Sequence, residues 1–117
     1  MGALHFRDDA TGEGLYAGRT YAAGEVVLDL ADVEWRARDK HTVEHPSGRH
    51  FFHPVLAKTA HSCDPNCAIA FDPLALVARR AIAPGEAVTI DYEATESVIS
   101  FPFDCLCGSP GCRGRIG

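Results

Sequence analysis

Three cysteines within eight residues constrain the fold more than any other feature of this sequence. Cys105, Cys107 and Cys112 form a C-x-C-x4-C pattern, and the Gly and Pro residues between them allow the loop to fold back. Thiolates at this spacing can converge on one zinc ion at the ~2.3 Å of a zinc–sulfur bond. Structural zinc needs four ligands, so one more must come from elsewhere in the chain. The candidates are His61, Cys63 and Cys67, each of which would fasten the tail to residues 61–67.

Two other interpretations of the cysteines stay open at this point. The same pattern is compatible with free thiols, or with a disulfide between Cys105 and Cys112. The N-terminal residues carry acid where a signal peptide needs an apolar core, and Phe6 where a myristoylation motif needs Ser or Thr. We therefore expect a cytoplasmic protein, a setting in which such a cluster indicates metal binding before it indicates disulfides.

Turn residues divide the chain into short segments rich in Val, Leu, Ile, Phe and Tyr. The turns are expected at residues 11–14, 23–25, 46–48, 72–73 and 84–86. One or two helical turns are expected over 54–60, after Pro54. A chain of 117 residues fits one domain. We predict a single, mostly β domain with strands at 26–30, 41–45, 49–53, 67–71, 74–81 and 87–92.

Charge and hydropathy narrow the range of partners. The net charge of −5 repels a phosphate backbone on average, so direct binding of nucleic acid is not expected. A cationic partner such as a basic peptide would suit the acidic surface, although this charge also serves solubility alone. The longest apolar runs have five residues, against the ~20 that cross a bilayer, so no membrane partner is expected.

Four motifs in order resemble those of the SET domain family. Residues 12–17, with 23–27 after them, are similar to the opening G-x-G segment and first strand of the family. Residues 61–67, His-Ser-Cys-Asp-Pro-Asn-Cys, resemble its Asn-His-Ser-Cys-x-Pro-Asn signature. Residues 82–92 resemble its Gly-Glu-Glu-Leu-Thr-Phe-Asp-Tyr strand, and the cysteine tail resembles its post-SET zinc loop. The resemblance runs from Gly12 to Gly114.

The resemblance implies a fold and a division of the chain. The family has a β-clip fold of small twisted sheets, in which one segment threads through a loop in a pseudoknot-like arrangement. Residues 1–100 would form the SET domain, and 101–117 the post-SET tail within the same structural unit. Cys63 would be the fourth zinc ligand beside Cys105, Cys107 and Cys112, which leaves Cys67 as the spare cysteine.

The resemblance also implies an activity. The family transfers a methyl group from S-adenosylmethionine, most often to the side-chain amine of a protein lysine. Tyr92 stands at the family's catalytic tyrosine, where its hydroxyl would orient the amine. His61 resembles a cofactor-pocket residue more than a general base. The residues implied in cofactor binding are Gly12, Glu13, Gly14, Ala60, His61, Tyr92 and Leu106.

The sequence departs from the family at two places that bear on substrate and cofactor. Ala60 replaces the usual asparagine, whose amide hydrogen bonds are worth about 0.5–1.5 kcal/mol each. The segment 33–52 is short, so the wall that it builds beside the acceptor is minimal. A second copy of the chain in a homodimer would supply that wall, or the acceptor would be a small amine. A zinc- and cofactor-binding module without catalysis is the remaining alternative.

Overall fold

Short β strands make up most of the regular structure in the computed structural model, which describes residues 3–9, 12–99 and 101–117. Two single-turn 3-10 helices accompany them, of which the first lies in the stretch predicted to be helical and the second was not predicted. In chain order the elements are β1 (Leu4–Asp9), β2 (Gly12–Ala17), β3 (Val26–Asp29), β4 (Glu34–Arg36), β5 (Val43–Glu44), β6 (His50–Phe52), η1 (Leu56–Lys58), β7 (Ala60–His61), β8 (Cys67–Phe71), β9 (Leu74–Ala78), β10 (Thr89–Ile90), η2 (Tyr92–Ala94), β11 (Phe103–Asp104) and β12 (Arg115–Ile116).

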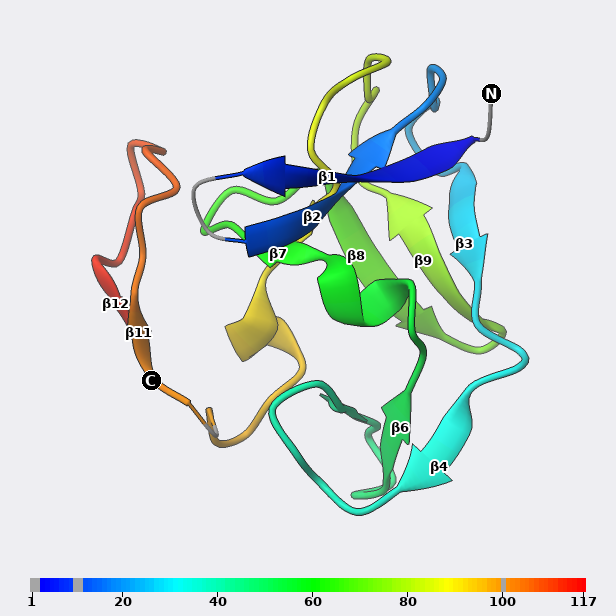
Figure 1. Cartoon of the computed structure of the whole chain (residues 1–117). Helices are drawn as coiled ribbons and strands as arrows, with labels where there is room; N and C mark the ends of the chain where they lie inside the picture. Colours follow the sequence, from blue (N-terminus) through cyan, green and yellow to red (C-terminus); the bar gives the residue numbers. More distant parts are fainter. Residues whose placement is uncertain (1–2, 10–11, 100) are drawn as a thin grey trace.

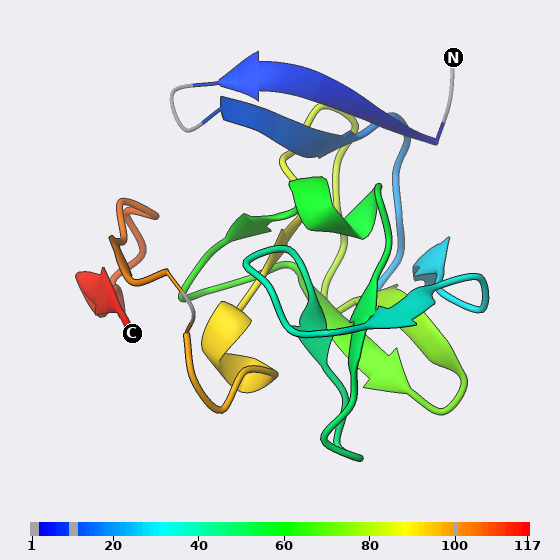
Figure 2. The ribbon, with the colours of Figure 1, turned by 60° about the horizontal axis from the view of Figure 1, so that its bottom comes forward.

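The strands are distributed over several small sheets, none with more than three described strands. β1 and β2 form a hairpin, β3-β9-β8 and β4-β6-β5 are antiparallel sheets, and β11 pairs with β12 in the tail. Figures 1 and 2 show the hairpin across one end of the molecule and the tail along one side. The expected fold of small sheets is therefore present.

The core lies between the β1-β2 hairpin, the β3-β9-β8 sheet and β6. Leu15 of β2, Phe51 of β6 and Leu76 of β9 are almost fully buried in it. Tyr21 also belongs to the core, and its hydroxyl donates to the carbonyl of Ala3. Trp35 of β4 is 39% exposed and lies edge-on to Phe51.

A parallel pair of strands brings together the two motifs that resemble the family signature. β7 pairs with β10 through Ala60–Thr89 and His61–Ile90, although 27 residues of chain separate the two strands. Asn66 continues the connection, since its buried side chain donates to the Ala87 carbonyl and accepts from the Thr89 N–H. This pairing fixes the segment before Cys63 against the segment before Tyr92.

Several element predictions need correction. Residues 12–14, predicted as part of a turn, belong to β2, because they pair in register with β1; Thr11 of that predicted turn lies outside the described residues. The strand predicted at 41–45 is reduced to β5 and that at 87–92 to β10. The helical turn predicted over 54–60 is η1 alone. No described helix is long and apolar enough to span a membrane.

Candidate functional site

Tyr92 is held at two points by the segment that contains β7. It lies two residues after the end of β10 and begins η2, which is capped by the Asp91 carboxylate through the Glu93 N–H. The Tyr92 N–H donates to His61 Nδ1 at 3.0 Å, and the Tyr92 hydroxyl donates to the Thr59 carbonyl at 2.6 Å. The parallel β7-β10 pair thus sets the position of the phenol.

Three rings pack around this point. The centroid of the Tyr92 ring lies 5.2 Å from that of His61 and 5.9 Å from that of Phe103, both in edge-to-face geometry. Burial raises the pKa of Tyr92 to about 12, so the hydroxyl stays protonated at neutral pH. The Tyr92 oxygen keeps lone pairs that can accept a hydrogen bond while its proton is directed at Thr59.

His61 serves Tyr92 as a positioning residue. Its side chain is 2% exposed, and burial lowers its pKa. Its Nδ1 accepts the Tyr92 N–H, and its Nε2 lies 3.5 Å from the Cys63 sulfur. Because both ring nitrogens have protein partners, the ring is poorly placed to act as a general base.

Two hollows in the surface share Tyr92. The first, called here the Phe101 hollow, is lined by residues 39–43, Leu56, Ala57, Thr59, Ile90, Tyr92, Thr95, Glu96, Ile99 and Phe101. The second, the Leu106 hollow, is lined by residues 13–14, 57–61, Tyr92 and 103–107. Ala57, Thr59 and Tyr92 line both, so these residues form the partition between the two spaces.

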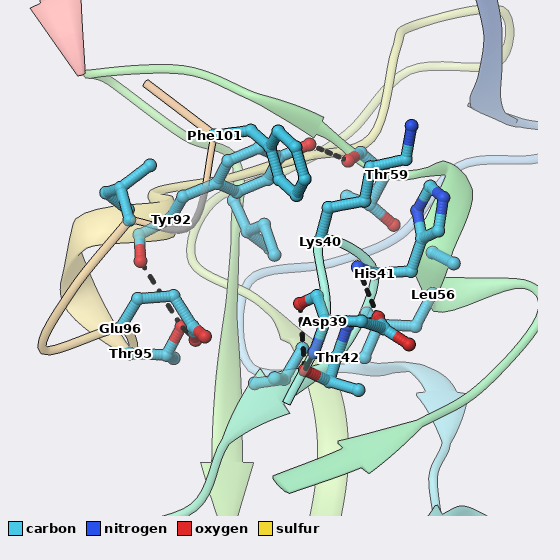
Figure 3. A pocket seen from close by; sticks show the side chains of 14 residues that line it. Asp39, Lys40, His41, Thr42, Leu56, Thr59, Tyr92, Thr95, Glu96 and Phe101 are labelled. Carbon is cyan, nitrogen blue, oxygen red and sulfur yellow. Dashed lines mark hydrogen bonds between the residues drawn. The ribbon is translucent and has the colours of Figure 1, made fainter. Parts of the chain in front are cut away.

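The Phe101 hollow contains apolar and charged walls. Figure 3 shows Phe101 beside Tyr92 on one side and Lys40 and His41 on the other, with the Tyr92–Thr59 hydrogen bond drawn. Leu56 and Ile90 are 4% and 5% exposed, which makes the floor of the hollow apolar. An apolar floor with a few polar groups around it is typical of a ligand-binding pocket.

The Leu106 hollow gathers six of the seven residues predicted for the cofactor. Glu13, Gly14, Ala60, His61, Tyr92 and Leu106 line it, whereas Gly12 lies next to it in β2 and is not among the lining residues. Leu106 is 87% exposed, so its side chain presents apolar surface on this side of the hollow.

Two further residues of this hollow lie outside the predicted set. Lys58 Nζ forms an ion pair with Glu13 Oε1 at 3.1 Å, which joins η1 to β2. The Oγ1 of Thr59 is buried and has no hydrogen-bond partner among the described residues. Both residues lie immediately before Ala60 and outside the four motifs that resemble the family, so no motif points to them.

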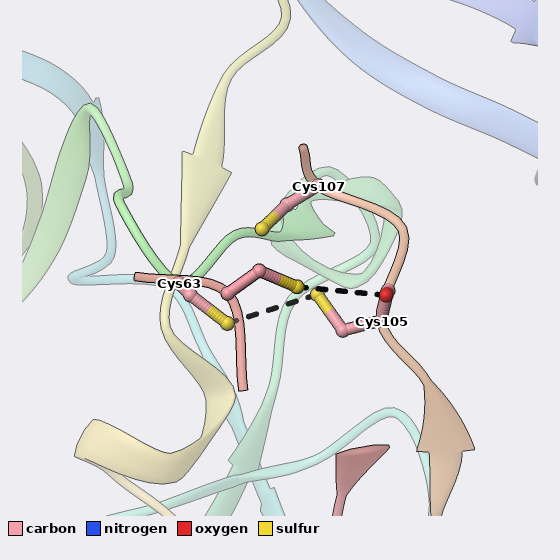
Figure 4. A group of neighbouring side chains, drawn as sticks. Cys63, Cys105 and Cys107 are labelled. Atoms are coloured by element: carbon pink, nitrogen blue, oxygen red, sulfur yellow. Dashed lines mark hydrogen bonds between the residues drawn. The ribbon is translucent and has the colours of Figure 1, made fainter. Parts of the chain in front are cut away.

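Four cysteines converge as the tail returns to the core. The sulfurs of Cys63, Cys105, Cys107 and Cys112 all lie within 4.8 Å of one another, and those of Cys63 and Cys105 are 3.7 Å apart (Figure 4). Tetrahedral zinc with ~2.3 Å bonds places its sulfur ligands about 3.8 Å apart. The all-thiolate donor set and this spacing fit zinc, and the fourth ligand position falls on Cys63.

Cys67 stands apart from the cluster. It is 0% exposed, and burial raises its pKa to about 12, so it is an inert core thiol.

Arg113, which no sequence motif predicts, lies beside the cysteine cluster. Its guanidinium pairs with Asp91 at 2.9 Å and Glu93 at 2.6 Å, and its backbone N–H and Nε donate to the Cys63 sulfur. Arg113 therefore links the tail, the cysteines and η2.

Comparison with known proteins agrees with this geometry. The family model described as the SET domain matches residues 12–93. The chain belongs to the SET domain family. Histone-lysine N-methyltransferase ash1 of Drosophila melanogaster is 40% identical over 63 residues, which are 49% of this chain and 3% of that protein. The chain thus spans only a small part of such a relative.

Solved SET structures share the fold. The methyltransferase domain of human histone-lysine N-methyltransferase SETMAR superposes with a TM-score of 0.68 at 20% identity, over 95% of this chain and 57% of that one. KRYPTONITE, solved in complex with mCHG DNA and SAH, superposes with a TM-score of 0.73 at 21% identity, over 96% of this chain and 28% of that one. These likenesses confirm the predicted SET fold.

Proposed function

We propose that this SET domain is an S-adenosylmethionine-dependent methyltransferase that acts on the side-chain amine of a protein lysine. The observation that carries the proposal is the partition between the two hollows, where Tyr92 and Thr59 face both spaces. A donor in one hollow and an amine in the other would meet at Tyr92. The names of relatives such as ash1, a histone-lysine N-methyltransferase, support lysine as the acceptor.

The residues of the Leu106 hollow fit the cofactor. When bound, S-adenosylmethionine supplies a sulfonium-activated methyl group. Leu106 offers exposed apolar surface for the adenine, and the Lys58–Glu13 pair offers one charge of each sign for the amino-acid end. The unpartnered Thr59 Oγ1 is a further polar group available to a ligand. Ala60 contributes no side-chain amide, so polar binding falls to these residues.

The residues of the Phe101 hollow would prepare the amine. A lysine has an ordinary pKa near 10.4, and only its neutral form has the lone pair that attacks a methyl group. The apolar floor of the hollow disfavours the ammonium and so promotes loss of its proton to solvent. The Tyr92 oxygen, fixed by Thr59 and His61, would orient the amine by accepting an N–H hydrogen bond. Such positioning accounts for much of the catalysis in a displacement reaction.

The first test is cofactor binding followed by methyl transfer. We expect the zinc-loaded chain to give a binding isotherm with S-adenosylmethionine, and to pass labelled methyl groups to a panel of lysine-rich proteins. Tyr92→Phe keeps the ring packed against His61 and Phe103 but loses the hydroxyl. Label transfer should fall about 10²–10³-fold while the isotherm persists.

Each contrary result has a distinct meaning. Absence of binding at about millimolar cofactor would remove the proposed function. Unchanged transfer in Tyr92→Phe would remove Tyr92 from its assigned role. Label that appears on small amines and never on proteins would replace the protein acceptor by a small-molecule one.

A further inference from the structure

The two lysines of the chain occupy the two hollows of the candidate site. Lys40 and Lys58 are its only lysines, against nine arginines. Lys58 lines the Leu106 hollow, where Glu13 pairs with it. Lys40 lines the Phe101 hollow, the space assigned above to the methyl acceptor. A lysine of the chain itself therefore lies where the substrate lysine is expected.

The local backbone holds Lys40 at the corner of a fixed turn between β4 and β5. The Asp39 carboxylate accepts from the N–H groups of His41 and Thr42, and the Thr42 hydroxyl oxygen accepts from the Asp39 N–H. Such a turn fixes the backbone on both sides of Lys40 and leaves its four-carbon side chain to move independently. In Figure 3 this side chain extends toward the Thr59 side of the hollow.

The Lys40 ammonium is held by an aromatic face. Its Nζ lies 5.7 Å from the centroid of the Phe101 ring, within the range of a cation–π contact. Among the described residues no carboxylate forms an ion pair with it, in contrast to Lys58. Phe101 is 63% exposed, so its cation–π contact with Lys40 is weak, and the Lys40 side chain can exchange it for another contact.

We propose that Lys40 is a methylation site of this chain, modified by its own active site. The proposal rests on the function proposed above. The Lys40 ammonium first releases a proton to solvent. The nitrogen lone pair then forms an N–C bond to the methyl group as the S–C bond of S-adenosylmethionine breaks, which leaves methyl-lysine and S-adenosylhomocysteine. Tethering in the Phe101 hollow replaces a second-order encounter by an intramolecular one, which raises the effective concentration of the amine.

Mass spectrometry of the full zinc-loaded chain tests the proposal. After incubation with S-adenosylmethionine, the intact mass should rise by one or more methyl groups, and peptide mapping should place them on Lys40. Lys40→Arg should abolish the increase. The fraction modified at a given time should not change over a tenfold range of protein concentration, because the reaction is intramolecular.

A control variant separates position from accessibility. Arg80 is exposed and lies outside both hollows, so the lysine introduced by Arg80→Lys should stay unmodified in the same reaction. Equal labelling of both lysines, or a rate proportional to protein concentration, would overturn the proposal.

A lysine-rich peptide in the same tube distinguishes this proposal from the proposed function. A methylated peptide with unmodified Lys40 would overturn self-methylation and leave the function standing. If peptide and Lys40 both stay unmodified although calorimetry detects cofactor binding, self-methylation and lysine transfer both fail.

Discussion

The ion pair between Lys58 and Glu13 is the residue-scale feature with the most direct consequence for binding. Both side chains are 43% exposed, so the pair contributes little to stability and is inexpensive to separate. The amino-acid end of S-adenosylmethionine carries a carboxylate and an ammonium, which complement Lys58 and Glu13. A ligand with that end can therefore replace the Lys58–Glu13 ion pair by two, one between its carboxylate and Lys58 and one between its ammonium and Glu13.

Lys58→Met tests this complementarity, since it retains the length of the side chain and removes the charge. A charge-assisted hydrogen bond is worth about 1.5–3 kcal/mol, so affinity for S-adenosylhomocysteine should fall about 10–100-fold in calorimetry. Methylthioadenosine, which lacks the amino-acid end, should bind the variant as tightly as it binds the parent chain. Equal losses for the two ligands would mean that Lys58 supports the shape of the hollow and does not contact the amino-acid end.

At the same scale, the sequence predicts residues that carry a family motif and misses those that do not. Glu13, Gly14 and Leu106 can be predicted because each lies in a recognisable family segment, and all three line the Leu106 hollow. Lys58 and Arg113 act through pairs distant in sequence, with Glu13 and Asp91 respectively. No local pattern reports such a pair.

At the scale of elements, Asn66 fastens the loop between β7 and β8 to Thr89 of β10 and to Ala87 just before that strand. It is 2% exposed, and its amide satisfies both the Ala87 carbonyl and the Thr89 N–H, at 2.7 and 2.9 Å. The Asn66 N–H in turn donates to the Thr89 hydroxyl at 3.0 Å. The parallel β7-β10 pair is only two residues long in each strand, and the hydrogen bonds of Asn66 add a second attachment to β10, from the loop that follows β7.

Asn66→Ala should therefore destabilise the fold strongly. Each buried group left without a partner costs about 1–3 kcal/mol, so the free energy of unfolding should fall by roughly 2–4 kcal/mol in urea titration. Asp64→Ala, two residues away, removes only an exposed ion pair with Arg80 and should cost at most about 1 kcal/mol. Similar losses in the two variants would contradict the role given to Asn66.

Element boundaries show where local sequence rules fail. The glycines of the G-x-G segment are typical of a turn, yet Gly12 and Gly14 pair with Asp9 and Arg7 in a regular hairpin. Hydrogen bonding to β1 outweighs local preference there. Tyr92 was expected at the end of a strand, but the Asp91 cap turns the chain into η2 first. Cys67–Phe71 is found as predicted, because a continuous apolar run bounded by turns is a strong strand signal.

At the scale of the whole molecule, the tail is bound to the core at two adjacent places. The cysteine cluster joins Cys63 to residues 105–112, and Arg113 joins the tail to Asp91 and Glu93 of the η2 region. The count of three tail cysteines predicts that a tertiary link exists. It cannot predict the second link, because an arginine beside a cysteine has many possible partners.

Metal analysis of two variants tests the cluster. The purified chain should carry about one zinc per molecule. Cys63→Ser should lose most of that zinc, and chelation of the parent chain should weaken cofactor binding, because residues 103–107 form a wall of the Leu106 hollow. Cys67→Ala should keep its zinc, since the Cys67 sulfur lies in the core. Zinc retained by Cys63→Ser and lost from Cys67→Ala would identify Cys67 as the fourth ligand.

The position of that wall in the chain has a consequence for biosynthesis. The other walls of the Leu106 hollow come from residues 13–14, 57–61 and Tyr92, all of which leave the ribosome before residues 103–107. A nascent chain that has grown only as far as Tyr92 lacks the wall that residues 103–107 form. The hollow proposed for the methyl donor is thus completed only when the tail cysteines have emerged and a metal ion can draw them onto Cys63.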